Sequence, residues 1–403
     1  MPEPIDGVAP TRGGPTSRRA IIVGGGIGGL TAALALRAAG IEAPVFERDP
    51  ADSARVTAGT GITVWSNATR VLEELGLLDR VLAAGSPLES FENRTARGRV
   101  IARWPIGDMG RRIGAPSISI RRSELHRVLR EKVGGELNFG SEYLGMEESE
   151  GAVTARFADG RRVSGDVLVG ADGLRSRVRD AVLPSAEPRF AGYVVYRGIV
   201  SPGPPVPPHI FVQMWGRGAR FGYYRVAPDQ AYWFAVVNEL GDGRTRSGVS
   251  KSALLDTFGR WAGPVAGLIE ASAEDSIVRS SIYDRDPVRP WSAGRATLLG
   301  DAVHPMTFNV GQGACQAIED AAVLARSLRS DADPVSALKQ YEAQRHSRTS
   351  GLTMRARRIG NLGRIQAATA CAVRDALLRP VLGGPARRQQ ELALAGGARL
   401  YDG

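Results

Sequence analysis

Short apolar runs alternate with helix-periodic segments at the start of the chain. The run RAIIVG (19–24) is flanked by turn residues and predicts a buried strand. The next segment, IGGLTAALALRAAG (27–40), has helical periodicity and ends on glycine, a common helix stop. APVFERD (43–49) predicts a second strand. Residues 19–48 therefore predict a β-α-β unit.

Amphipathic patterns follow this unit. One or two helices are predicted over 67–85, with a break at Gly76, and a further helix over 122–135. An alternating pattern then predicts a hairpin turned at the Asp-Gly pair 159–160, which runs into a strand at 166–171.

The pattern changes over residues 187–240. Three runs, HIFVQMW, ARFGYYRVA and AYWFAVVNEL, are rich in aromatic and β-branched residues and predict a separate antiparallel sheet. The stretch SPGPPVPP (201–208) predicts a rigid loop within it. Helical periodicity then returns, with one more buried strand at 295–301 and a largely helical stretch from 312 to about 398.

These patterns predict an α/β fold, in α+β two-domain form, with a discontinuous nucleotide-binding domain. Residues 1–17 are expected to be a disordered tail. Residues 18–180 and 286–403 are assigned to the nucleotide-binding domain with its C-terminal helices, and 181–285 to an inserted β-sheet domain for a substrate.

Composition narrows the class of protein. The net charge is +10, but it is carried mostly by scattered arginines, which argues against a nucleic-acid partner. No apolar run approaches the roughly 18 residues of a membrane span, and the N-terminus has no signal core, so a cytoplasmic protein is expected. The two cysteines and four histidines are too dispersed to predict a metal site.

The sequence GGGIGG follows the first strand and opens the first helix. Its glycines Gly24, Gly26 and Gly29 permit a tight turn and the close approach of a pyrophosphate to the helix N-terminus. Glu47, at the end of the second strand, is placed to accept hydrogen bonds from a ribose, which favours FAD or NAD over NADP. The alternative is a glycine-rich turn without a ligand.

Two later loops carry further candidate chemistry. The strand at 166–171 delivers Asp172, although an Asp-Gly pair alone is usually only a turn. Asp301 ends another strand, and Gly311, Gln312 and Gly313 leave backbone N–H groups free at a helix start, where an anion is stabilised. The alternative there is an ordinary strand–loop–helix joint.

Together these motifs resemble the group A (single-component) FAD-dependent monooxygenases, which include salicylate and para-hydroxybenzoate hydroxylases, urate hydroxylase and zeaxanthin epoxidases. The matching pieces, within residues 19–402, are VGGGIGGL, VFERD, GTGITVWSNATRVLEELGLLDRV, IRRSELHRVL, GADGLRSRVR, YRG and GDAVHPMT…GQGACQAIEDA. The resemblance implies a Rossmann-like FAD-binding domain of the para-hydroxybenzoate hydroxylase type with an inserted β-rich substrate domain and C-terminal helices.

The resemblance also implies roles for cofactor-binding residues. Gly24, Gly26 and Gly29 would bind the pyrophosphate, Glu47 would bind the adenosine ribose, and Arg48 would flank the adenine. Arg122 would reach the phosphates and the ribityl chain, Asp301 would contact the ribityl chain, and Asp172 would support the FAD. The isoalloxazine would be lined by Pro305 and by the backbone of Gly311, Gln312 and Gly313.

Catalytic and substrate residues are implied more sparsely. Arg220 is similar to an arginine that some members place beside flavin N5 and pair with the aspartate here numbered Asp301, and Tyr232 to a substrate-facing tyrosine. The alternative is that Arg220 and Tyr232 are plain sheet residues. The candidate cavity wall residues are Tyr196, Met214, Tyr223, Phe234 and Phe308.

The implied reaction uses NADH or NADPH as a transient reductant and O₂ to hydroxylate or epoxidise an aromatic or unsaturated small molecule of secondary metabolism, through a flavin C4a-hydroperoxide. A monomer or homodimer without nucleic-acid or membrane partners is expected.

One alternative is a non-redox cyclase in which FAD is mainly structural. A plain NAD dehydrogenase is opposed by the Asp301 loop, and a halogenase by the absence of a Trp-x-Trp-x-Ile-Pro signature.

Two residues of the loop GDAVHPMTFNVGQG stand out. The family usually has proline where this chain has Phe308, so the cavity is reshaped or oxygen transfer is compromised. His304 invites a catalytic interpretation, but nothing nearby in sequence supplies an orienting acid, and a structural loop histidine is predicted.

Overall fold

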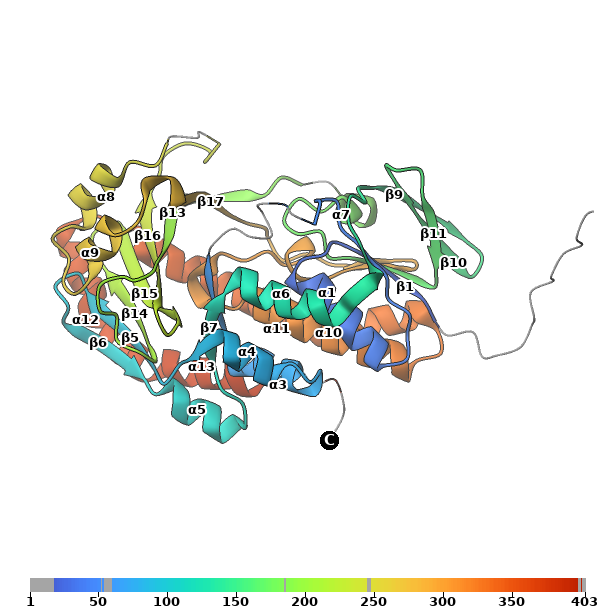
Figure 1. The fold of residues 1–403 in the computed structure, drawn as a ribbon, viewed down its shortest axis with the longest axis horizontal. Coiled ribbons are helices and arrows are strands. Elements are labelled where there is room, and N and C mark those ends of the chain that lie inside the picture. The colour runs from blue at the N-terminus through green and yellow to red at the C-terminus, as the bar shows by residue number, and fades with distance from the viewer. Residues whose placement is uncertain are drawn as a thin grey trace, which may run out of the picture.

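The computed structural model describes residues 18–51, 53, 60–184, 186–244, 248–397 and 400. The predicted N-terminal tail lies outside these residues. The molecule is elongated, with a sheet-rich lobe at each end and the long helices α10 (Gly313–Ser330) and α11 (Pro334–Gly363) between them (Figure 1). No helix in these described ranges is long and apolar enough to cross a bilayer.

A six-stranded sheet forms the centre of one lobe, in the order β18-β19-β12-β1-β2-β8. The predicted β-α-β unit is β1 (Ala20–Val23), α1 (Ile27–Ala38) and β2 (Val45–Phe46), and β1 pairs in parallel with both β2 and β12. The other strands are β8 (Leu137–Asn138), β12 (Val167–Gly170), β18 (Ser292–Ala293) and β19 (Ala296–Leu298). Helix α1 packs against α10 and against α6 (Arg122–Val133). The predicted Rossmann-like fold is therefore confirmed.

The other predicted local elements also form. The break at Gly76 separates α3 (Ser66–Glu74) from α4 (Leu78–Ala84), and this glycine has a left-handed φ of 68°. The hairpin at 159–160 joins β10 (Ala152–Phe157) to β11 (Arg162–Gly165), which form a three-stranded sheet with β9 (Tyr143–Ser149).

The second lobe contains a seven-stranded sheet in the order β17-β13-β16-β15-β14-β5-β6. Its strands are β5 (Ser90–Thr95), β6 (Val100–Trp104), β13 (Arg189–Val200), β14 (Ile210–Trp215), β15 (Ala219–Ala227), β16 (Gln230–Asn238) and β17 (Val278–Asp284). The sheet is thus not continuous in sequence, because β5 and β6 come from within the stretch assigned to the nucleotide-binding domain. β5 joins it by parallel pairing with β14. The domain boundaries stay a prediction.

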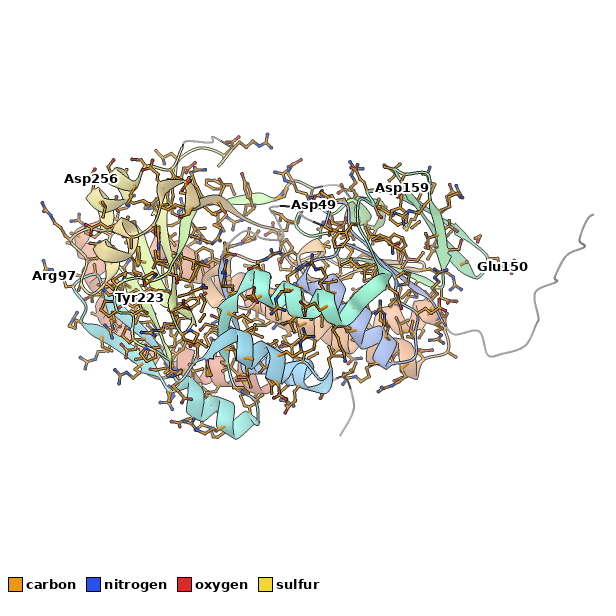
Figure 2. The ribbon with its side chains drawn as sticks, viewed as in Figure 1. Asp49, Arg97, Glu150, Asp159, Tyr223 and Asp256 are labelled. Carbon is orange, nitrogen blue, oxygen red and sulfur yellow. The ribbon has the colours of Figure 1, made fainter. Side chains whose placement is uncertain are left out.

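The two faces of this sheet have different coverings. One face packs against α8 (Lys251–Phe258) and α9 (Val265–Glu270) around a separate apolar core. In Figure 2, Tyr223 lies within this lobe, whereas the exposed charged residues Arg97, Glu150, Asp159 and Asp256 lie at the edges of the molecule. The other face looks toward the nucleotide-binding domain.

Smaller elements connect the lobes. A three-stranded antiparallel sheet has the order β3-β7-β4, and β7 lies against β15. Its strands are β3 (Gly61–Val64), β4 (Gly85–Pro87) and β7 (Ile118–Arg121). Helix α12 (Ala368–Gly383) packs on β6, and α13 (Pro385–Ala395) packs on α3 and on α5 (Ile106–Ile113).

Candidate active site

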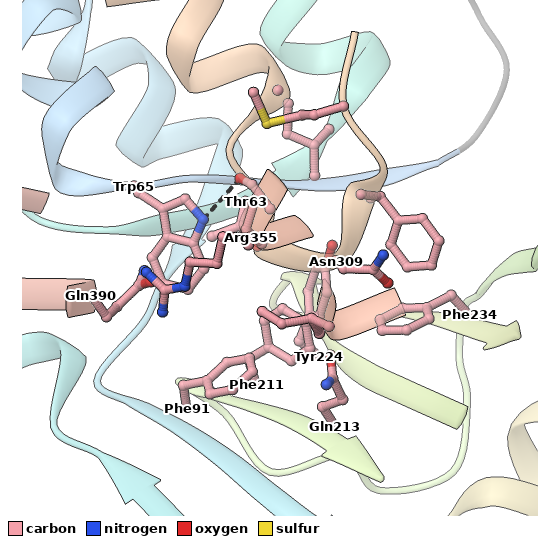
Figure 3. Close-up of a pocket in the computed structure, with 18 of the residues that line it drawn as sticks. Thr63, Trp65, Phe91, Phe211, Gln213, Tyr224, Phe234, Asn309, Arg355 and Gln390 are labelled. Atoms are coloured by element: carbon pink, nitrogen blue, oxygen red, sulfur yellow. Dashed lines mark hydrogen bonds between the residues drawn. The ribbon is translucent and has the colours of Figure 1, made fainter. Parts of the chain in front are cut away.

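A cavity of about 780 Å³ lies between the seven-stranded sheet, β3, the start of α10 and the C-terminal helices. Its glycine end comprises Arg122, Asp301, Gly311 and Gly313; its sheet end comprises Arg197, Phe211, Tyr224, Tyr232 and Phe234. In Figure 3 the side chains of Phe211, Gln213 and Tyr224 rise from the sheet toward Trp65 and the loop of Asn309. The cavity therefore joins the candidate cofactor loops to the inserted sheet.

The three glycines of the first motif play different physical roles. A Cβ on Gly24 would lie 2.4 Å from the Ala171 carbonyl oxygen, and Gly24 has φ of 109°. A Cβ on Gly29 would lie 1.9 Å from the Gly24 carbonyl oxygen. Packing alone therefore requires both. A Cβ on Gly26 would meet no atom within 4 Å, so open space lies before the N-terminus of α1, where a phosphate fits.

Glu47 is held at the end of β2 by backbone donors. Its Oε2 accepts from the Gly25 N–H at 2.7 Å, and its Oε1 accepts from the Asp49 N–H at 2.9 Å. Arg48 is exposed and pairs with Asp49 at 3.7 Å. The carboxylate of Glu47 is thus fixed beside the glycine-rich loop, as ribose recognition requires.

Helix α6 supplies two residues to this region. Arg122 was predicted from the sequence, and His126 was not. Arg122 lines the cavity, and His126, one turn later, has Nε2 2.7 Å from the Gly25 carbonyl oxygen. Burial lowers the pKa of His126. A neutral imidazole with a proton on Nε2 donates to this carbonyl and steadies the loop. The i, i+4 spacing of Arg122 and His126 was the signal that could have revealed this residue.

The Asp301 side chain lines the glycine end of the cavity and is accessible from it, although many protein atoms lie nearby. Burial raises the pKa of its carboxyl, and His304 and Arg122 oppose the shift. Burial also lowers the pKa of Arg122, and Asp301 opposes that shift. Asp301 Oδ1 is the nearest atom, at 4.0 Å, to a Cβ built on Gly313. The helix start is therefore open to a polar ligand edge beside one carboxylate, which fits the ribityl and ring portions of FAD.

The GQG stretch presents backbone to the cavity and keeps its glutamine away. Gly311 has φ of 64°, and its carbonyl accepts from Trp65 Nε1 at 2.9 Å. The Gln312 side chain is buried, and its Oε1 accepts from Asn67 Nδ2 and Gln316 Nε2, each at 3.0 Å. Pro305 is buried and lies outside the cavity lining, contrary to expectation.

A buried ionic network lies behind this helix start. Arg345 donates to Asp320 Oδ1 at 2.7 Å and to Glu319 Oε2 at 2.5 Å. His304 Nε2 lies 2.6 Å from Asp320 Oδ2. Burial alone would raise the pKa of Asp320, but His304 and Arg345 lower it to about 2. The expectation that no acid orients His304 was wrong, because the carboxylate of Asp320, on the following helix α10, holds its imidazole.

Asp172 serves as a helix cap in this structure. Its Oδ2 accepts from the N–H groups of Arg177 at 2.8 Å and Val178 at 3.3 Å, at the start of α7 (Arg177–Val182). Burial raises the pKa of its carboxyl, and these hydrogen bonds oppose the shift. Asp172 directly follows Ala171, which packs on Gly24, but it does not line the cavity.

The predicted wall residues divide between the two faces of the sheet. Tyr232, Phe234 and Phe308 line the cavity. Met214 and Tyr223 belong to the core on the opposite face, and Tyr196 packs against that core, so their assignment to the wall was wrong. Strand side chains alternate between faces, and a shift of one residue inverts the assignment.

Arg220 faces the nucleotide-binding domain but lies behind the wall. It is 1% exposed, and its guanidinium lies 5.7 Å from the Tyr193 ring, 5.6 Å from Trp215 and 5.8 Å from Phe308. Burial lowers its pKa, and Tyr193 opposes the shift. Within the described ranges it forms no ion pair, so the expected pairing with Asp301 was wrong.

Several side chains of the sheet end were not predicted from the sequence. Arg197, Phe211, Gln213 and Tyr224 line the cavity, and Ser280 joins them from β17. The two-residue alternation on β14 would have pointed to Phe211 and Gln213 once one facing residue was known, and the pairing of Tyr224 with Tyr232 would have pointed to Tyr224.

Comparison with known proteins adds independent findings. The model of the FAD-binding domain family matches residues 18–356. The aurachin C monooxygenase/isomerase of Stigmatella aurantiaca is 41% identical over 365 residues, covering 90% of this chain and 94% of that relative. The 3-amino-4-hydroxybenzoate 2-monooxygenase of Streptomyces cremeus is 36% identical over 370 residues, covering 90% and 91%.

A solved structure shows the same fold. Klebsiella pneumoniae HpxO, complexed with FAD and uric acid, superposes with a TM-score of 0.87 and 31% sequence identity. The match covers 94% of this chain and 97% of that chain. The agreement therefore extends over nearly the whole chain and includes both lobes.

Proposed function

This chain belongs to the FAD-binding domain family of FAD-dependent monooxygenases. From that membership we propose which class of substrate it oxygenates and which residues bind the FAD and the substrate. The proposed substrate is an aromatic small molecule that carries a polar oxygen. The reductant is NADH or NADPH and the co-substrate is O₂.

One observation carries this proposal: a single cavity connects the glycine end with an aromatic sheet end. Its volume, about 780 Å³, is within the range of small-molecule sites, roughly 300–1,000 Å³. Phe211, Phe234 and Phe308 supply aromatic surface, while Arg197 and Tyr232 supply polar groups. Such a lining favours a flat ring that carries at least one hydrogen-bonding oxygen.

We assign the pyrophosphate to the open space at Gly26, outside the cavity lining but next to Ile27, which belongs to it, with Gly24 and Gly29 shaping the loop. Glu47 would hold the ribose, and Arg48 the adenine edge. The bound FAD supplies hydride acceptance and oxygen activation.

Arg122 and Asp301 would hold the ribityl region, and the N–H groups of Gln312 and Gly313 would stabilise negative charge on the ring. The Gly311 N–H is not available for this role, because it donates to the Phe308 carbonyl at 2.8 Å. Asp172 would act indirectly, by fixing α7 beside the glycine loop.

At the sheet end, we assign substrate orientation to Tyr232 and exclusion of water to the surrounding aromatic rings. Burial raises the pKa of Tyr232, and Arg197 opposes the shift. Its hydroxyl therefore stays protonated at neutral pH and donates a hydrogen bond. Arg220 would act through Phe308 and Tyr193, without touching the substrate.

The test uses the purified protein, reconstituted with FAD. Oxidation of NADH and NADPH is followed under O₂ with aurachin C, 3-amino-4-hydroxybenzoate and uric acid, and products are identified by mass spectrometry. A product with one added oxygen atom supports the proposal. An isomer without added oxygen would instead support the non-redox cyclase, and flavin that no reductant and substrate can turn over would refute the monooxygenase assignment.

A further inference from the structure

The charged groups that line the cavity are unbalanced. Within the described lining they are four guanidinium groups and one carboxylate: Arg122, Arg197, Arg355, Arg358 and Asp301. Arg122 and Asp301 interact at the glycine end. Arg355 and Arg358 come from α11, and Arg358 is exposed. Arg197 is the cation that the seven-stranded sheet itself presents to the cavity.

Arg197 lies on β13, and its partners are neutral. Its Nη1 donates to Ser280 Oγ at 3.0 Å, and it also hydrogen-bonds with Tyr232. Its guanidinium lies 5.8 Å from the centre of the Phe308 ring. Among the ion pairs of the described residues, none includes Arg197. The charge is thus oriented by neighbours that do not neutralise it.

Other arginines of the same strand pair contrast with Arg197. Arg189, also on β13, makes two hydrogen bonds to the Asp284 carboxylate, at 2.9 and 2.8 Å. Arg279, on the neighbouring β17, pairs with Glu239. The carboxylates of this sheet edge are therefore committed elsewhere. Arg197 faces the cavity, where an ionised or strongly accepting oxygen would complete its hydrogen bonds.

We infer that Arg197 is a substrate-specificity residue, which binds an anionic or strongly polarised oxygen on the aromatic substrate through its free guanidinium edge. Ser280 holds the guanidinium in place, and the Tyr232 hydroxyl is a second donor to the same oxygen. Phe308 covers the other side of the guanidinium. This inference rests on the proposed aromatic substrate, and it assigns the anchoring role to Arg197, because Arg220 is enclosed behind the wall.

The test measures binding, which does not require turnover. The FAD-loaded protein is titrated with 2-naphthoate, 2-acetonaphthone and naphthalene, which share two rings but carry an anionic oxygen, a neutral carbonyl oxygen and no oxygen. The variants are Arg197→Met, Arg197→Lys and Ser280→Ala. Arg217→Met is the matched control, because Arg217 is exposed in the turn between β14 and β15 of the same sheet and lies outside the cavity lining.

Arg197→Met is expected to weaken 2-naphthoate binding by about tenfold or more and to leave naphthalene binding unchanged. Arg197→Lys should recover part of the loss, since it keeps the charge but lacks the planar fork. Ser280→Ala should have a smaller effect in the same direction, and Arg217→Met none. The order of affinities in the unaltered protein should be naphthoate, acetonaphthone, naphthalene.

Thermal unfolding without ligand provides a second measurement. Arg197→Met should keep or raise the melting temperature, because it removes a charge that has no carboxylate partner. The inference is overturned if naphthoate binds no more tightly than naphthalene, or if Arg197→Met weakens all three probes equally. Arg197-dependent naphthoate binding without any oxygenated product would instead overturn the proposed function and leave this assignment standing.

Discussion

The two ends of the cavity are built by different means. The glycine end is made of backbone at strand and helix termini, with a left-handed turn at Gly311, and the open space at Gly26 lies next to it, beside Ile27 of the lining. The sheet end is made of side chains from several different strands, such as Arg197, Phe211 and Tyr232. A group common to a whole family suits a backbone site, whereas a group that varies suits a site made of exchangeable side chains.

The two ends also differ in what stabilises them. Behind the glycine end, Glu319, Asp320 and Arg345 form a buried ionic network. The sheet end depends on ring contacts, such as Phe211 with Tyr224 at 4.6 Å and Tyr224 with Tyr232 at 5.1 Å. Substitutions should therefore perturb one end while sparing the other.

Arg345→Met should have the largest effect, because it removes the buried guanidinium that pairs with both Glu319 and Asp320 and leaves them only Arg348 and His304 as partners. The free energy of unfolding is expected to fall by about 3–5 kcal/mol. Chemical denaturation followed by circular dichroism measures this change. Arg127→Met is the control, since Arg127 forms exposed pairs on α6 that contribute roughly 0–1 kcal/mol. Equal losses in the two variants would show that the network does not stabilise this end.

Gly222→Ala should damage the sheet end alone. A Cβ on Gly222 would lie 2.2 Å from Phe234 Cζ, so the ring must move into the cavity. We expect a loss of about 2 kcal/mol in stability, weaker binding of 2-naphthoate, and unchanged binding of FAD. Gly351→Ala is the control, because a Cβ there meets no atom within 4 Å. Weakened FAD binding would contradict the independence of the two ends.

This contrast explains what could be predicted from sequence. The β-α-β unit, the three glycines and the acids Glu47 and Asp301 follow from local pattern and strand–loop–helix order. The pairing of β5 with β14 brings together segments more than a hundred residues apart, and local pattern does not contain it.

The face of each strand was equally hidden. Met214 and Tyr223 are as aromatic or apolar as true wall residues, and only the register of the sheet places them on the other side. Asp320 was missed as the partner of His304 because the loop that contains His304 folds back against α10, and this brings residues 16 positions apart into contact.

Gly26→Ala is the counterpart of Gly222→Ala in the proposed pyrophosphate site. Since a Cβ on Gly26 meets no protein atom within 4 Å and its φ is −74°, the variant should fold normally. The added methyl group would occupy the space proposed for the pyrophosphate. FAD binding should weaken by about tenfold, or roughly 1.4 kcal/mol, in a flavin fluorescence titration. Gly351→Ala again serves as the control, and unchanged FAD affinity would place the pyrophosphate elsewhere.

Phe308 connects the two ends, and its replacement should have the smallest effect. Its backbone belongs to the loop of the glycine end, yet its ring contacts Phe234 at 5.7 Å and lies 5.8 Å from both Arg197 and Arg220. Phe308→Leu should lower stability by about 1 kcal/mol, through lost ring–ring and cation–π contacts, and weaken 2-naphthoate binding while leaving FAD affinity unchanged.

Met214→Leu is the matched control for Phe308→Leu, because Met214 also lies within the sheet lobe but belongs to the core on the face away from the cavity. It conserves volume and should change neither ligand's affinity. If Phe308→Leu instead weakened FAD binding and spared naphthoate, the ring would act at the glycine end. The presence of Phe308 where the family usually has proline would then affect the position of the cofactor loop, and it would not affect the shape of the sheet end of the cavity.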